Sequence, residues 1–366
     1  MAQRIDILGL VRFLLASSVI LGHLWRDPVF DCHRHAVIGF FCISGYLITR
    51  IRATVYADRT SAFLLNRFLR IYPQYIIAVL LGAAAVLLLP EAAKTMNPAL
   101  QWPATATDWA RQLFIVGLYE HPVRLSPPTW SLNVELYFYA VVGLLTFRSE
   151  KGTYAAFLLT LAVGMLALFQ VWTNPVFRVV PTQFYGSPTG NAFVFFMGSA
   201  TYFVSRRVRL PGWVPYAALL GYAVNSFVLP AFFNELMSRD GLLAVSACLI
   251  SLVLLASPSI RTPGARLVAL IDFLGRMSYP LFLIHWVASV WLYALIGQSD
   301  PWLFLGGFPS SLALAALLVV AVDRPVELIR RRIRQERRGG SSRIAGADAG
   351  AARVHPMAPR PESPGA

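Results

Sequence analysis

Charged residues are scarce in this chain of 366 residues: Asp, Glu, Lys and Arg make up 14% of it, against 57% hydrophobic residues. A soluble globular domain carries about 25% charged residues and does not repeat apolar runs of about twenty. The composition therefore excludes an ordinary soluble domain. It predicts an all-α polytopic membrane protein.

Cysteine is almost absent, with three residues in the whole chain. Cys42 and Cys248 fall in apolar segments, where buried thiols are common, and Cys32 lies in a short polar loop. No CxxC pair occurs, so we expect neither a disulfide framework nor a cysteine metal site. His33 and His35 are separated by an arginine and have no further ligands nearby, so we expect no metal there.

Acidic residues are also few, 18 against 32 Lys and Arg, which leaves a net charge of +14. In a soluble protein this would indicate nucleic acid. Here the basic residues cluster at the ends of apolar segments, where they orient the chain and contact anionic lipid. We therefore expect anionic membrane lipids as partners, and no nucleic acid.

Ten apolar segments are long enough to predict transmembrane helices. They cover about 5–25, 36–53, 71–90, 132–148, 154–172, 190–205, 213–230, 241–257, 279–297 and 304–322. Basic residues favour one set of loops by about three to one, which predicts an N-in/C-in topology with about ten transmembrane helices. Residues 91–131 are too polar and Pro-rich to span, although Leu113 to Leu118 could form an interfacial piece.

The two ends of the chain differ from this pattern. Arg12 interrupts the first apolar segment and no A-x-A cleavage site follows it, so we expect this helix to be retained. Residues 328–338 form a basic juxtamembrane segment, and residues 339–366 are rich in Gly, Ala and Pro. We predict a membrane domain over 1–327 and a disordered cytoplasmic tail over 339–366.

Arg12 and His23 stand inside the first apolar segment. Eleven residues at about 100° each make roughly three turns, so both lie on one helical face, roughly 16–17 Å apart. A charge near the middle of a membrane helix costs on the order of 2.5–3.5 kcal/mol and usually marks a function. Gly9, Ala16 and Val19 lie near the same stripe and leave room. We interpret this face as the wall of a reaction channel.

Two further motifs follow. The segment FFCISGYLI places Ser44 and Tyr46 around a glycine in the second span, which by itself indicates close helix packing. Arg67 and Arg70, at i and i+3, share a helix face and could grip a phosphate in bidentate fashion. The alternative for the arginine pair is an ordinary positive-inside anchor.

Two motifs open later spans. In TWSLNVE, Glu135 is the acidic residue of an apolar segment that begins with Trp130 and Ser131, where it could orient an imidazole or cap a helix end. In SYPLFLIHW, Tyr279 precedes His285, which could be catalytic or a satisfied core histidine. The sequence DRP, at residues 323–325, is expected to close and anchor the last span.

In order, these pieces resemble the membrane-bound acyltransferase-3 family of carbohydrate O-acyltransferases. The matching residues are Arg12 with His23, FFCISGYLI, RFLRIYP, TWSLNVELYFY, SYPLFLIHW and DRP. The resemblance implies a ten-helix inner-membrane enzyme. Such an enzyme moves an acyl group, commonly acetyl, from cytoplasmic acyl-CoA to a hydroxyl of a saccharide or lipid-linked saccharide.

The resemblance also implies site residues. Arg12, His23 and Glu135 correspond to the family's catalytic positions, and Arg67 and Arg70, with Arg12, to its donor-binding arginines. Secondary candidates are Ser44, Tyr46, Trp130, Ser131, Tyr279 and His285.

The chain departs from the family's pattern in two respects. Many members carry Gly-Val-Asp where this chain has Ala36-Val37-Ile38. No acid from that position can pair with His23, so we expect Glu135 to take that role. The extracytoplasmic hydrolase-like domain of some members is also not seen.

The implied mechanism places the nucleotide end of CoA on Arg67 and Arg70, with the pantetheine arm threading past Arg12 to His23. His23 would be a general base on the acceptor hydroxyl or carry the acyl group transiently. Three alternatives remain: a transporter or flippase for a glycan or small molecule, a non-catalytic scaffold, and an acyltransferase for a non-saccharide secondary metabolite.

Overall fold

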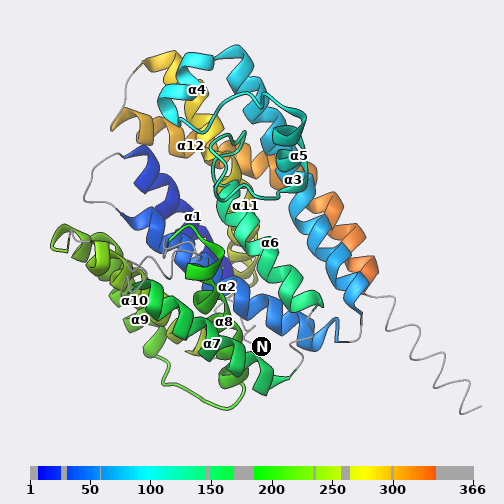
Figure 1. Ribbon diagram of the computed structural model, residues 1–366, viewed down its shortest axis with the longest axis vertical. Helices are drawn as coiled ribbons and strands as arrows, with labels where there is room; N and C mark the ends of the chain where they lie inside the picture. The colour runs from blue at the N-terminus through cyan, green and yellow to red at the C-terminus, as the bar shows by residue number, and fades with distance from the viewer. Residues whose placement is uncertain are drawn as a thin grey trace, which may run out of the picture.

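The computed structural model describes residues 7–25, 31–57, 59–144, 149–168, 185–233, 236–256, 264–297 and 301–334. These residues form twelve α-helices and no strand (Figure 1). The helices are α1 (Leu8–Leu24), α2 (Cys32–Thr54), α3 (Thr60–Leu88), α4 (Pro90–Met96), α5 (Ala106–Phe114), α6 (Thr129–Leu144), α7 (Glu150–Leu168), α8 (Pro188–Ser205), α9 (Val214–Phe227), α10 (Leu236–Ala256), α11 (Ala265–Ile296) and α12 (Trp302–Leu318). The predicted tail over 339–366 lies outside the described residues.

The helices confirm a polytopic membrane protein. Each of the ten predicted segments overlaps one helix, namely α1, α2, α3 and α6 to α12. Six helical stretches are long and apolar enough to cross a membrane: Cys32–Thr54, Thr60–Leu88, Val214–Ala231, Arg239–Ala256, Ala265–Ile296 and Trp302–Arg334. Helix α1 is a shorter apolar helix.

Three helices extend beyond the segments predicted from hydropathy. Helix α3 begins at Thr60 instead of residue 71, and α11 begins at Ala265 instead of residue 279. The last helix continues from Trp302 to Arg334, so DRP lies within this helix and does not end it. A π turn over Val319–Asp323 precedes Pro325 and shifts the backbone hydrogen bonds where proline has no N–H to donate.

The polar stretch between α3 and α6 contains only the short helices α4 and α5, which have 7 and 9 residues. Neither is long enough to span a membrane. Helix α5 begins with a reciprocal capping box between Thr105 and Asp108, and it ends at Ile115, whose φ of 54° is left-handed. The Tyr75 hydroxyl of α3 donates to the Gln112 carbonyl and fixes α5 against the bundle.

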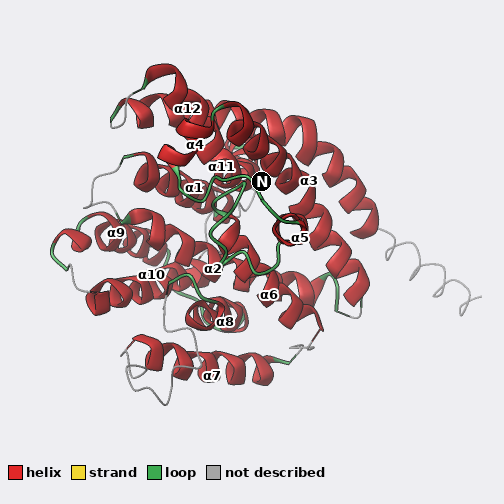
Figure 2. Cartoon of the chain, turned by 45° about the horizontal axis from the view of Figure 1, so that its top comes forward, coloured by secondary structure: helices red, strands yellow, loops and turns green. Residues whose placement is uncertain are grey.

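Helix α1 lies between α12 on one side and α2 and α10 on the other (Figure 2). It contributes residues to two hydrophobic cores. One core is built mainly from α2, α6, α8 and α10, and the other mainly from α3, α11 and α12. Leu15 and Val19 of α1 pack in the first core, while Ala16 and Ile20 pack in the second. The helix therefore forms the seam between the cores, with α2 on one side and α11 on the other.

Glycines set the closest helix contacts. A Cβ on Gly45 of α2 would meet the Phe195 carbonyl of α8, and a Cβ on Gly198 of α8 would meet the Cys42 carbonyl of α2. On α1, a Cβ on Gly9 would lie 2.9 Å from the Ile271 carbonyl oxygen of α11. Small residues thus bring these backbones together, as membrane helix packing favours.

Candidate active site

A cavity with a volume of about 450 Å³ lies at the Leu8 end of the α1 seam. It is bounded by the ends of α1, α3 and α11 and by the extension of the last helix. Six arginines line it against three carboxylates: Arg12, Arg67, Arg70, Arg276, Arg330 and Arg334, with Asp272, Asp323 and Glu327. The lining is therefore strongly cationic and suits an anionic ligand.

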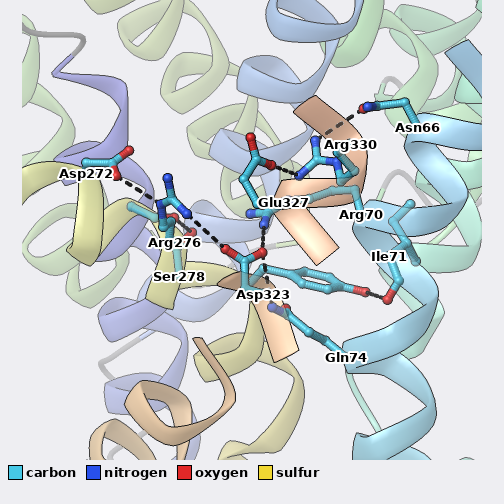
Figure 3. A network of polar contacts seen from close by, with 12 residues as sticks. Asn66, Arg70, Ile71, Gln74, Asp272, Arg276, Ser278, Asp323, Glu327 and Arg330 are labelled. Atoms are coloured by element: carbon cyan, nitrogen blue, oxygen red, sulfur yellow. Dashed lines mark hydrogen bonds and ion pairs between the residues drawn. The ribbon is translucent and has the colours of Figure 1, made fainter. Parts of the chain in front are cut away.

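Asp323 joins two of these arginines (Figure 3). It is buried, accepts a 2.6 Å hydrogen bond from Arg70, and lies 3.6 Å from Arg276. The Gln74 amide also donates to it at 3.4 Å. Arg276 is held on its other side by Asp272 at 2.9 Å. The carboxylate fixes arginines from α3 and α11 in one place.

Asn66 joins a second pair of arginines, of which Figure 3 shows Arg330. Its side-chain oxygen accepts from Arg67 at 2.9 Å and from Arg330 at 3.2 Å. Arg330 also pairs with Glu327 at 2.7 Å. Within the described ranges, the Nε atoms of Arg67 and Arg330 are buried without a hydrogen-bond partner. These guanidinium groups therefore retain donors for a ligand.

Sequence reasoning found Arg67 and Arg70 but missed Arg276, Arg330 and Arg334 as members of this cavity. The basic run RRRIRQERR was interpreted as a lipid anchor beyond the membrane domain. Its first residues are brought to the cavity because the last helix does not end at Asp323.

Two smaller cavities, of about 80 and 60 Å³, continue from the arginines into the bundle. Arg12 lines both of them and the large cavity. Ser44, Glu135 and Tyr279 line both small cavities, and Ser131 lines the innermost one. The structure thus brings most of the predicted site residues together around Arg12.

Glu135 is the polar centre of these small cavities. Its carboxylate accepts hydrogen bonds from the Ser44 and Tyr139 hydroxyls. The Tyr279 hydroxyl donates to the Ile71 carbonyl at 3.1 Å and closes the cavity wall between α11 and α3. Arg12 and the carboxylate therefore face one space.

Two secondary candidates lie elsewhere. Tyr46 packs edge-on against Tyr202 of α8, with ring centroids 5.8 Å apart, and lines none of the three cavities. Trp130 packs against Tyr185 at 5.1 Å. Both contacts are aromatic packing between neighbouring segments.

His23 lies in a cluster of rings at the other end of α1. Its centroid is 4.6 Å from that of His33, 4.9 Å from Trp286, and 5.4 Å from His285, to which it is parallel within 5°. His285 donates from Nδ1 to the Phe282 carbonyl at 2.8 Å, which leaves Nε2 as a bare acceptor. In the described part of the chain, this buried Nε2 has no partner.

The expectation that Glu135 pairs with His23 is not supported by this geometry. Glu135 bonds to Ser44 and Tyr139 beside Arg12, whereas His23 contacts His33, His285 and Trp286. The reason is the length of α1, which separates the Arg12 and His23 levels by roughly 16–17 Å.

The stripe between Arg12 and His23 is also narrower than expected. Ala16 and Val19 are packed in the cores and line none of the three cavities, while Gly9 lines the large one. Phe40 and Phe282, whose rings are 5.7 Å apart, line the innermost cavity, and no histidine of the described residues lines it.

His33 was missed because the sequence groups it with His35. The structure separates the two: His35 hydrogen-bonds to Ser246 of α10 at 2.8 Å, whereas His33 faces His23. In the described residues, no three His, Cys, Asp or Glu side chains are placed to share a metal ion.

The helical bundle is that of a polytopic membrane protein, and its arginine-lined cavity has the charge to suit an anionic ligand. The acyltransferase domain family matches residues 5–320, so the chain belongs to the acyltransferase-3 family. It is a membrane-bound acyltransferase.

Two relatives refine this assignment. The chain is 28% identical to the peptidoglycan O-acetyltransferase OatA of Listeria monocytogenes serovar 1/2a, over 75% of this chain but only 48% of that protein. It is 24% identical to Nodulation protein 10 of Rhizobium leguminosarum bv. viciae, over 88% of this chain and 93% of that protein. No solved structure matches the chain.

Proposed function

We propose that this protein is an integral membrane O-acyltransferase that moves an acetyl group from cytoplasmic acyl-CoA to a hydroxyl of a cell-envelope or exported saccharide. Family membership supports acyl transfer. The name of the Listeria relative supports O-acetylation of a glycan. The proposal includes ten membrane spans, with both ends of the membrane domain on the cytoplasmic side of the inner membrane, because the basic loops favour that orientation.

The observation that carries the proposal is the row of three cavities that share Arg12. It begins among six arginines, where the phosphates of CoA would be bound, and ends at Phe282, one helical turn from His285. Arginine binds phosphate in bidentate fashion through its planar fork. The pantetheine arm is long enough to extend from these arginines along α1 towards His23.

His23 acts in this proposal as the general base. It takes the proton from the acceptor hydroxyl while the oxygen attacks the thioester carbonyl, so that a C–O bond forms and the C–S bond breaks. The proton then passes from His23 to the CoA thiolate, which leaves as the thiol. Such a group typically accelerates a reaction by about 10²- to 10⁴-fold. Transient acylation of His23 is the second route to the same products.

The test uses purified protein in lipid vesicles with radiolabelled acetyl-CoA and soluble peptidoglycan fragments. Arg67→Gln should raise the KM for acetyl-CoA by about tenfold or more with little change in kcat, because one charge-assisted hydrogen bond is lost. His23→Ala should lower kcat by about 10²-fold or more at unchanged KM.

Arg111→Gln and His121→Ala are matched controls, since both residues lie in the segment between α4 and α6 and line none of the three cavities. Full activity in His23→Ala would remove this residue from the mechanism. A wild-type protein that binds no acetyl-CoA would refute the proposed donor. Binding without transfer would refute the proposed acceptor.

A further inference from the structure

The arginines of the large cavity are held in two pairs, and the two pairs differ in what joins them. One pair shares the carboxylate of Asp323. The other pair, Arg67 and Arg330, shares the neutral side chain of Asn66, whose oxygen accepts from them at 2.9 and 3.2 Å. An amide oxygen carries no net charge, so it brings two cations together without compensating them. Arg67 and Arg330 thus form an amide-bridged pair.

A single carboxylate lies at ion-pair distance from this amide-bridged pair, and other arginines share it. Glu327 pairs with Arg330 at 2.7 Å, with Arg331 at 3.6 Å, and also with Arg334. Its one negative charge cannot balance three guanidinium groups. Among the residues that the structure describes, Arg67 has no carboxylate within ion-pair distance. The amide-bridged pair therefore carries an excess of positive charge.

The amide-bridged pair also has hydrogen-bond donors without acceptors. In the described part of the chain, Nε of Arg67, Nε of Arg330 and Nδ2 of Asn66 are buried and have no hydrogen-bond partner. Asn66 is fully buried, Arg330 is 8% exposed, and both arginines line the large cavity. Unpaired buried donors are rare in folded proteins. Three of them around two uncompensated cations indicate a site for an anion.

Arg330 stands at the end of the row of cavities that is farthest from Glu135. Arg12 lines all three cavities and Arg67 lines two, whereas Arg330 lines only the large one. Figure 3 shows Arg330 on the last helix, bonded to Asn66 of α3. Acyl-CoA has a matching order of groups: from the thioester follow the pantetheine arm, the pyrophosphate, and the ribose with its 3′-phosphate. With the thioester beyond Arg12, the 3′-phosphate is the charged group nearest the position of Arg330.

The charge of the 3′-phosphate also fits the amide-bridged pair. A phosphate monoester carries about −1.5 to −2 charges at pH 7 and has three strong acceptor oxygens. Each phosphate of the pyrophosphate carries a single negative charge and two free oxygens. Arginine binds phosphate oxygens through its planar fork of N–H groups. The most strongly charged group of acyl-CoA therefore matches the pair that lacks its own carboxylate and has unused donors.

We propose that Arg67 and Arg330 bind the 3′-phosphate of acyl-CoA and that Asn66 positions the two guanidinium groups for it. This inference rests on the proposed acyl-CoA donor. Arg330 then determines donor specificity, because it distinguishes acyl-CoA from thioesters that carry the same pantetheine arm without a 3′-phosphate. No bond forms or breaks at this site. It supplies binding energy far from the reacting carbonyl.

The first experiment compares acetyl-CoA with acetyl-dephospho-CoA, which lacks only the 3′-phosphate, in the vesicle assay. In the wild-type protein, acetyl-dephospho-CoA should have a KM about tenfold or more above that of acetyl-CoA, because charge-assisted hydrogen bonds are lost. Arg330→Gln should raise the KM for acetyl-CoA to a similar value and leave the KM for acetyl-dephospho-CoA nearly unchanged.

Arg331→Gln is the matched control for Arg330→Gln. Arg331 is the next residue of the same helix and also pairs with Glu327, but it lines none of the three cavities. This variant should keep the donor preference of the wild-type protein. A wild-type protein without a preference, or a preference that survives in Arg330→Gln, would overturn the proposal.

Asn66→Asp separates positioning from simple packing. Aspartate has nearly the same size and accepts hydrogen bonds from both arginines, but its charge compensates them in place of the phosphate. We expect this variant to unfold at or above the melting temperature of the wild-type protein and to lose the preference for acetyl-CoA. A folded Asn66→Asp protein that keeps the full preference would overturn the positioning role.

The second experiment measures binding and does not depend on transfer. Calorimetry with the protein in phosphatidylcholine nanodiscs compares CoA with dephospho-CoA. The wild-type protein should bind CoA about tenfold or more tightly, and Arg330→Gln should bind the two ligands equally. Equal affinities in the wild-type protein would overturn the proposal, and binding of neither ligand would refute the proposed donor with it. The expected preference in a protein without transferase activity would instead refute the proposed function alone.

A lipid can supply the same chemistry, since phosphatidic acid also carries a phosphate monoester. Nanodiscs that contain phosphatidic acid should leave the preference for CoA over dephospho-CoA in place, because the nucleotide occupies the site. Loss of the preference in these nanodiscs would assign the amide-bridged pair to a lipid headgroup and overturn the proposal.

Discussion

Glu135 offers a sharp test of the buried site, because a glutamine has the same size but no charge. Its carboxylate accepts hydrogen bonds from two hydroxyls, those of Ser44 and Tyr139, and both donate to the same oxygen, Oε1. In Glu135→Gln the amide oxygen can accept from both hydroxyls, but both hydrogen bonds become neutral.

The loss of stability in Glu135→Gln follows from the number of hydrogen bonds that lose their charged partner. A hydrogen bond to a charged group contributes about 1.5–3 kcal/mol and a neutral one about 0.5–1.5 kcal/mol. Replacing two charged hydrogen bonds by two neutral ones lowers the free energy of unfolding by about 2–3 kcal/mol. Arg12 and Arg67 line the same cavity as Glu135, so loss of the carboxylate also removes their nearby counter-charge.

A double-mutant cycle measures this arrangement. Tyr139→Phe removes one of the two hydroxyls that donate to Glu135, so Glu135→Gln should cost at least about 1 kcal/mol less in that background. Denaturation in detergent micelles supplies the free energies. Tyr154→Phe is the control, because Tyr154 forms the same i,i+4 bond with Glu150 in α7, at 2.8 Å. Additive effects of Glu135→Gln and Tyr139→Phe would refute the shared carboxylate.

Three further predictions concern packing, pH and donor choice. Gly45→Ala should destabilise the protein by about 1–3 kcal/mol, because the added methyl group overpacks a helix crossing. Gly212 has open space around it, so Gly212→Ala should not destabilise the protein. Thermal unfolding of the two variants in detergent measures the difference. Hydrogen bonds from the N-cap threonine of α5 lower the pKa of Asp108. The contribution of Asp108 to the stability of α5 is therefore complete above its unfolded pKa of about 3.9 and is lost as the pH falls through its lower folded pKa. In that acidic range the hydrogen exchange of the α5 amides should increase in the wild-type protein, and it should not change with pH in Asp108→Asn. Phe282→Ala should raise the rate with butyryl-CoA relative to acetyl-CoA, because Phe282 closes the innermost cavity; an unchanged ratio would exclude this ring as the limit on acyl length.

Hydropathy predicted where the helices lie but not where they end. An apolar window stops at the first charged residues, yet the backbone hydrogen bonds of a helix do not depend on apolar side chains. The arginines that complete the large cavity stand on such polar extensions: Arg276 in α11 and Arg330 in the last helix. Their position depends on which helices pack together, and the linear pattern does not contain that information.

The two histidines near the start of α2 also could not be assigned to their neighbours from the sequence alone. His33 and His35 are two residues apart, which on a helix is about 200°, so they face opposite sides. One contacts α1 and the other α10. Helical geometry alone predicts this separation once the helix is known to begin at Cys32. Because the sequence predicted a polar loop around Cys32 instead of a helix, this separation of His33 and His35 was not predicted.

The position of α1 explains how this bundle can hold so many polar groups. A charge inside a single apolar core would disrupt its packing and lose its hydration. Helix α1 instead separates two cores that are each closed by their own apolar contacts. Arg12 on this seam is surrounded by cavities large enough for water, so its charge is not enclosed in hydrocarbon. Because Gly9 and Gly22 let α1 approach α11 and His33 closely, polar groups from several helices can meet along the seam. A reaction path at this place therefore costs neither core its packing.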